Sequence, residues 1–186
     1  MAGATLRPGI EQRCHQALDS LVLFNSSQLL QCQLAPSLPP PLPPQEGVAA
    51  VVLLNSFGSL GWDVNGLSGM RLPLLSVAGS LDLITPPGPE QLRPFLETPH
   101  PHSRLALIDG ASHFSPIRVA AEEEVLFGIG EALVGVDPPR IQHAISQLTT
   151  DFISGLEQNR PLASQHLRVS GVNVRLIDRA QARTVL

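Results

Sequence analysis

An aspartate and a histidine each follow the end of an apolar run that predicts a strand. Asp82 comes just after PLLSVAG (73–79), and His113 comes just after RLALID (104–109). In open parallel sheets, ligands bind beyond the carboxyl ends of the strands. A carboxylate that accepts a hydrogen bond from one imidazole nitrogen fixes the tautomer and leaves the other nitrogen free as a base. Either residue alone has a structural alternative, a turn aspartate or a capping histidine, but together they predict an acid–base pair at one sheet edge.

Three apolar runs predict the strands that position this pair. Besides residues 73–79 and 104–109, residues 48–54 form a valine-rich run, which is typical of a strand buried on both faces. The segment between the second and third runs has room for one short helix. Amphipathic patterns predict helices over residues 118–134 and 138–158. Apolar strands that alternate with helices indicate the α/β class, so we expect a mostly parallel sheet with flanking helices.

The rest of the chain has weaker signals. Leucine spacing predicts a helical stretch over residues 9–34, which Asn25-Ser26-Ser27 can divide in two. Residues 35–47 hold a run of prolines and predict an extended connector. Residues 159–186 form a tail that is either a late strand pair or loose. We expect residues 1–186 to form a single domain that is an incomplete version of its fold.

Bulk composition excludes several classes of protein. The formal net charge is −4, with 43% apolar and 15% charged residues, which describes a globular chain without the basic cluster of a nucleic-acid-binding protein. The longest apolar stretch is too short to span a bilayer, and the N-terminus has no apolar segment of the signal-peptide kind. His100 and His102 lack a third ligand at a recognisable spacing. We therefore expect no nucleic acid, no membrane span, no metal and no cofactor.

The two cysteines, Cys14 and Cys32, both lie in the predicted helical stretch. They have neither a CxxC spacing nor histidines nearby with a ligand spacing, so we expect buried or free thiols. Such cysteine usage favours a reducing compartment and a cytoplasmic location.

The sequence around Asp82 and His113 resembles a known family. The order strand, GSLDLITP, helix, strand, GASHF resembles the C-terminal portion of α/β-hydrolases, whose catalytic triad runs serine, aspartate, histidine along the chain. More narrowly, VVLLNSFGS, LPLLSVAGSLDLITPPGPEQLRPF and LALIDGASHFS resemble bacterial predicted dienelactone hydrolases, relatives of platelet-activating-factor acetylhydrolase-like lipases. The resemblance covers about residues 10–160. It implies hydrolysis of a small ester or lactone, with Asp82 as triad acid and His113 as triad base.

The sequence lacks a matching triad serine. The family places this serine in a GxSxG turn between a strand and a helix, and no such motif occurs in this chain. Ser56 in LNSFG is the nearest candidate nucleophile, but Leu54 stands where a small residue is required. Residues 59–72 also leave too little room for the usual helix, strand and helix. The resemblance therefore implies that the nucleophile-bearing half lies outside this chain, and we expect the chain alone to be inactive.

Two classes of function remain open. The first is a serine-type hydrolase for which this chain supplies the acid and the base. The second is a catalytically inactive hydrolase remnant or an interaction module. In both cases, the strand over residues 48–54 would lack the neighbour that a complete hydrolase provides. An unpaired apolar edge is a template for association, so we expect self-association through this edge.

Overall fold

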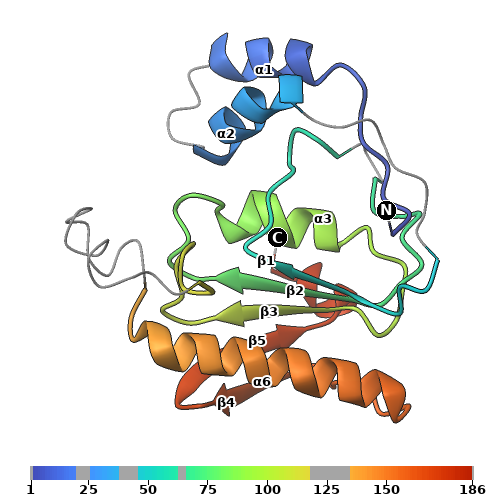
Figure 1. Cartoon of the computed structure of the whole chain (residues 1–186), viewed down its shortest axis with the longest axis vertical. Helices are drawn as coiled ribbons and strands as arrows, with labels where there is room; N and C mark the ends of the chain where they lie inside the picture. Colours follow the sequence, from blue (N-terminus) through green and yellow to red (C-terminus); the bar gives the residue numbers. More distant parts are fainter. Residues whose placement is uncertain (1, 20–25, 38–45, 63–65, 118–134, 186) are drawn as a thin grey trace.

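A five-stranded mixed sheet is the centre of the fold (Figure 1). The computed structural model describes residues 2–19, 26–37, 46–62, 66–117 and 135–185. The strands are β1 (Val51–Leu54), β2 (Leu74–Gly79), β3 (Arg104–Ile108), β4 (Gln165–Val169) and β5 (Val172–Ile177), and their order in the sheet is β1-β2-β3-β5-β4. The first three strands are parallel, whereas β5 is antiparallel to both β3 and β4. The α/β class is confirmed, but only one half of the sheet is parallel.

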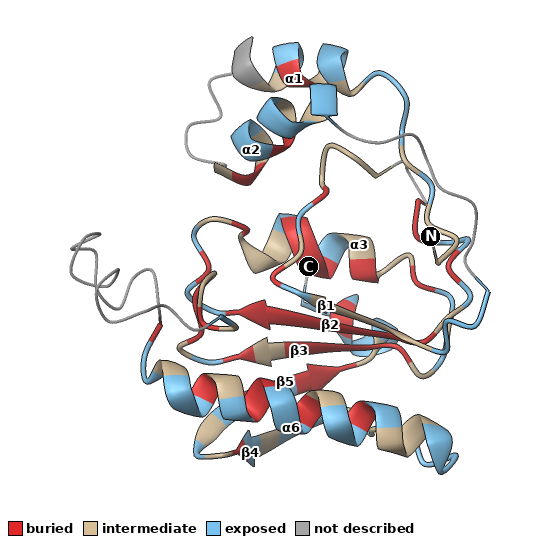
Figure 2. Cartoon of the chain, in the orientation of Figure 1, coloured by how far each residue is buried: buried red, intermediate tan, exposed pale blue. Residues whose placement is uncertain are grey.

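The strand β2, which lies between β1 and β3, is buried along its whole length (Figure 2). Its side chains alternate between two hydrophobic cores, one on each face of the sheet. Leu75 and Val77 lie in the core on the side of α6 (Pro138–Glu157). Leu74 and Ala78 lie in the other core together with Phe95. A strand that faces two cores has no polar face, which explains its continuous apolar sequence.

Helices cover the two faces unequally. α6 presents a helical stripe of apolar residues to the first core: Ile141, Ile145, Leu148 and Phe152. The other face is covered beside β2 by a short helical segment, in which the π-helical turn η2 (Gly88–Leu92) continues into α3 (Arg93–Phe95). This segment is the short helix that the sequence predicts between the second and third strands.

A disulfide joins the two N-terminal helices, α1 (Ile10–Asp19) and α2 (Ser26–Leu34), which pack against each other on the α3 side of the sheet (Figure 1). Cys14 bonds to Cys32, and their Cα atoms lie 5.5 Å apart. The expectation of buried or free thiols is therefore wrong. In one continuous helix these Cα atoms would be about 27 Å apart, because each residue advances 1.5 Å. Division into two packed helices is what brings the cysteines together.

The C-terminal tail is the late strand pair rather than a loose segment. β4 and β5 pair with Val169 opposite Val172, so a two-residue turn joins them. Ser170 and Gly171 both have positive φ, 52° and 84°, as a type I′ turn requires. A short helix, α7 (Arg179–Ala182), follows. No helix within the described ranges is long and apolar enough to cross a membrane.

Two further expectations fall wholly or mostly on residues that the structure does not describe. The helix predicted over residues 118–134 overlaps that part of the chain entirely. Of the connector predicted over residues 35–47, the described part includes Ala35–Ser37, which forms the short 3-10 helix η1, and a turn at Glu46 and Gly47.

Candidate active site

Asp82 and His113 meet at the carboxyl edge of the parallel half of the sheet. Nδ1 of His113 lies 3.1 Å from Oδ2 of Asp82. The Asp82 side chain is 1% exposed, and the His113 side chain is 23% exposed. Because Nδ1 faces the carboxylate, Nε2 is the nitrogen that can exchange a proton with a ligand. The structure thus brings together the two residues that the sequence pairs, while their catalytic role remains a prediction.

The turn after β2 supplies the donors for the buried carboxylate. Oδ1 of Asp82 accepts hydrogen bonds from the backbone N–H groups of Ile84, at 3.0 Å, and Thr85, at 2.7 Å. Such local bonding is typical of an aspartate in a turn. The structural and chemical interpretations of Asp82 are therefore compatible, since one oxygen holds the turn and the other faces the imidazole.

Thr85 is a site residue that sequence reasoning missed. Its hydroxyl donates to Oδ2 of Asp82 at 2.6 Å and lies 3.0 Å from Nδ1 of His113. A hydroxyl has one proton to donate and can also accept a hydrogen bond, so the Thr85 oxygen can accept a hydrogen bond from Nδ1–H of His113 while its own proton is donated to Asp82. Thr85 is fully buried. A threonine three residues after an aspartate and just before a proline is the signal that could have identified it.

Asn55 joins the end of β1 to the loop after β3 that contains Ser112 and His113, which we call the histidine loop. Its side-chain N–H₂ donates to the carbonyl of Ser112 at 2.9 Å and to that of His113 at 2.8 Å. Its φ of 44° lies in the left-handed region, which asparagine tolerates better than most residues. Ser56, the nearest candidate nucleophile in the sequence, comes next. Within the described residues no hydrogen bond joins the Ser56 hydroxyl to His113, and the Ser56 carbonyl accepts one from Gln91.

A second buried carboxylate anchors α2 to the loop after β1. Oε2 of Glu90 accepts the backbone N–H groups of Gly58, at 2.9 Å, and Ser59, at 3.0 Å. Gln31 of α2 donates to the same oxygen at 3.4 Å, and its own Oε1 accepts the N–H of Leu60 at 2.8 Å. We call Gln31, Glu90 and residues 58–61 the α2 clamp. Residues 58–61 follow closely after Asn55, which holds the histidine loop. One short stretch of chain therefore contacts both the α2 clamp and the histidine loop.

Two further histidines, His100 and His102, lie on the loop before β3, away from the loop that carries His113. The rings of His100 and His102 pack edge to face with centroids 5.2 Å apart. Burial lowers the pKa of His100, and the neighbouring His102 lowers it further. The described part of the chain contains no group of three or more side chains placed to hold a metal ion.

Comparison with known proteins identifies no family. No protein-family model matches the chain, and no curated protein matches it.

Proposed function

We propose that Asp82 and His113 are the acid and the base of an α/β-hydrolase that hydrolyses a small ester or lactone by serine-type catalysis. The observation that carries the proposal is the contact of 3.1 Å between Nδ1 of His113 and Oδ2 of the buried Asp82. A carboxylate in this position orients the imidazole and stabilises it when it becomes protonated.

In the proposed reaction, His113 accepts the proton of a serine hydroxyl as that hydroxyl attacks the ester carbonyl. The protonated imidazole then gives this proton to the leaving alcohol, and the acyl group remains on the serine. In the second half, His113 removes a proton from water, which attacks the acyl-serine and releases the acid. The serine recovers its proton from the imidazole. Thr85 and Asp82 hold Nδ1 throughout, so Nε2 performs each transfer.

The proposed nucleophile comes from outside these 186 residues. Ser56 makes no hydrogen bond to His113 in the described part of the chain, and its LNSFG setting lacks the first glycine of a nucleophile turn. Among the described strands, β1 pairs only with β2, and no described strand occupies its outer edge, which could take a further parallel strand. A strand added there would place its carboxyl end beside Asn55 and the histidine loop.

The test compares two chains on a p-nitrophenyl ester. We expect no turnover above background from the 186-residue chain. A longer chain, extended upstream in the same reading frame through a GxSxG-like turn, should hydrolyse the ester. Its rate should fall about a thousandfold in His113→Ala, since general acid–base catalysis contributes on that order. His143→Ala, at an exposed histidine of α6, is the matched control and should leave the rate unchanged.

Two results would contradict this proposal. Turnover by the 186-residue chain that Ser56→Ala abolishes would place the nucleophile within the chain. Turnover by the longer chain that survives His113→Ala would remove His113 from the mechanism. An upstream stop codon with no such turn would instead favour the inactive remnant or interaction module. The observation that favours an interaction role is the outer edge of β1, which pairs with no described strand and where Leu54 is 43% exposed.

A further inference from the structure

The antiparallel half of the sheet has one face that α6 does not cover. Val174 and Leu176 of β5 point toward α6 and its core. The opposite face carries two rows of side chains set by the strand register, Leu107, Arg175 and His166 in one row and Asp109, Asn173 and Arg168 in the next. Side chains alternate along each strand, so residues two apart share a face and the two rows lie side by side.

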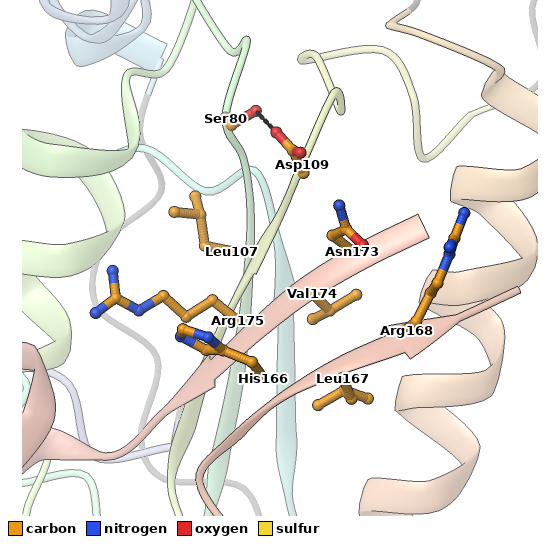
Figure 3. A pocket seen from close by; sticks show the side chains of 9 residues that line it. All are labelled: Ser80, Leu107, Asp109, His166, Leu167, Arg168, Asn173, Val174 and Arg175. Atoms are coloured by element: carbon orange, nitrogen blue, oxygen red, sulfur yellow. Dashed lines mark hydrogen bonds between the residues drawn. The ribbon is translucent and has the colours of Figure 1, made fainter. Parts of the chain in front are cut away.

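This face forms a groove of about 540 Å³ (Figure 3). Its volume is within the range of small-molecule sites. Ser80, the residue after β2, lies at one end of the groove beside Asp109. The Ser80 hydroxyl accepts the N–H of Gly110 at 2.9 Å and donates to Oδ1 of Asp109 at 3.4 Å. These bonds hold the Asp109 carboxylate at that end of the groove.

The opposite end of the groove is rich in hydrogen-bond donors. Arg175 and His166 are exposed, are cross-strand partners, and lie next to each other (Figure 3). Neither side chain makes a hydrogen bond or ion pair with any other described residue. Carboxylates outnumber basic side chains in this chain, whose formal net charge is −4. A shortage of carboxylates therefore does not explain why Arg175 lacks an ion-pair partner among the described residues. A free guanidinium fork suits a carboxylate, which it can bind through two parallel hydrogen bonds.

We propose that this groove binds a small organic carboxylate that carries a hydroxyl group at its other end. Arg175 and His166 bind the carboxylate, the carbon chain lies over Leu107, and the hydroxyl donates to Asp109. The two rows are about 7 Å apart, because two residues of a strand advance by that length, so a chain of about four carbons fits. This site uses residues other than Asp82 and His113, and it is independent of the proposed hydrolysis.

The test is an NMR titration of the isotope-labelled full chain with 4-hydroxybutyrate. We expect millimolar affinity, with shifts at the amides of Leu107, Asn173 and Arg175. Arg175→Gln should weaken binding about tenfold, as expected for loss of a charge-assisted bidentate contact. Arg140→Gln removes the same charge from the helix on the opposite face, where the side chain is 65% exposed. This control should bind as the parent chain does.

Succinate tests the end of the groove that holds Asp109. It has the same four carbons but a second carboxylate in place of the terminal CH2OH group, so Asp109 should repel it and it should bind about fivefold more weakly. Asp109→Asn should remove this preference. Thermal melting of each variant checks that it is folded. The proposal is overturned if neither probe shifts the groove amides, if succinate binds as well as 4-hydroxybutyrate, or if Arg140→Gln weakens binding as much as Arg175→Gln.

Discussion

The carboxylate of Asp82 is buried, so its oxygens need hydrogen-bond donors from the protein in place of water. Burial of an ionised carboxylate without partners is strongly unfavourable. Two backbone N–H groups satisfy Oδ1, while the Thr85 hydroxyl and the His113 imidazole satisfy Oδ2. The turn and the acid–base pair are therefore a single hydrogen-bonded unit, and damage to either should disturb both.

Thr85→Val tests this unit at its most connected residue. Valine keeps the shape of threonine but removes the hydroxyl, so Oδ2 of Asp82 loses a donor in a buried setting. We expect the free energy of unfolding to fall by about 1–3 kcal/mol, measured by urea denaturation. Thr85→Ser keeps the hydroxyl and should recover most of the loss of hydrogen bonding. A valine variant as stable as the parent chain would show that the hydroxyl contributes little to the unit.

Sequence reasoning located Asp82 and His113 because both signals are local, a polar residue just after an apolar run. It missed Asn55 and Glu90 because their partners lie far along the chain. Asn55 contacts the carbonyl groups of Ser112 and His113, and Glu90 contacts the backbone of Gly58. Such contacts depend on which strands are neighbours in the sheet, which no short stretch of sequence encodes.

At the scale of elements, the α2 clamp links a peripheral helix to the loops around the site. Gln31 is 4% exposed and uses both ends of its amide in the clamp. Gln31→Ala should therefore increase amide hydrogen exchange in α2 and in residues 58–61, because their shared hydrogen bonds are lost. Gln33→Ala, at an exposed position on the same helix, is the matched control. Equal exchange in both variants would contradict the clamp.

The N-cap of α7 gives a pH-dependent prediction. Chiefly because its side chain accepts the backbone N–H of Gln181, the pKa of Asp178 lies below its ordinary value. A carboxyl whose pKa is lower in the folded state stabilises the fold above its unfolded pKa, and this contribution is lost as pH falls through the folded pKa. Asp178→Ala should cost about 1 kcal/mol of unfolding free energy at neutral pH.

The loss of unfolding free energy caused by Asp178→Ala should become smaller when denaturation is measured below about pH 4. As the pH falls through the folded-state pKa, the Asp178 carboxyl of the parent chain becomes protonated and loses its advantage over alanine. Asp151→Ala removes an exposed carboxylate from the middle of α6 and serves as the control for a change of net charge. A cost that stays constant across this pH range would show that the Asp178 cap does not depend on the ionised carboxylate.

The sequence predicted the positions of several strands and helices well, but it did not predict how the strands are arranged in the sheet. Apolar runs located β2 and β3 to within a residue or so, and amphipathic spacing located α6, since both signals reflect burial. The same signals did not give strand direction. β5 enters the sheet antiparallel to β3 because the short turn after β4 reverses the chain, and that turn depends on positive φ at Ser170 and Gly171.

At the scale of the whole molecule, the disulfide gives a direct chemical test. We expect the chain purified without reductant to show no free thiol when unfolded and assayed with a thiol reagent. Replacing both Cys14 and Cys32 by serine should lower the free energy of unfolding by about 3 kcal/mol, because the cross-link restricts the unfolded chain. Two free thiols per chain would contradict the pairing. A stable disulfide is typical of oxidising compartments, which weighs against the predicted cytoplasmic location.

The outer edge of β1 gives a prediction about association. Its sequence VVLL has no charge to discourage pairing with another strand. We expect the chain alone to self-associate in light scattering, and Leu54→Lys should restore the monomer. Leu83→Lys, at a leucine that is 72% exposed on the loop after β2, controls for a general loss of surface hydrophobicity. A parent chain that is monomeric at all concentrations would contradict association through the edge of β1.

The two edges of the sheet differ, and this difference limits what association can build. β1 ends one side with apolar residues, whereas β4 ends the other with the exposed polar side chains of Gln165, His166 and Arg168. If only the apolar β1 edge can pair with a strand of another copy, each subunit can take part in only one such contact. Two copies that meet β1 to β1 therefore form an isologous pair around a two-fold axis, in which neither copy has a receptive edge left. The mass should double with concentration and then reach a plateau, because a closed symmetric pair cannot propagate into a fibre.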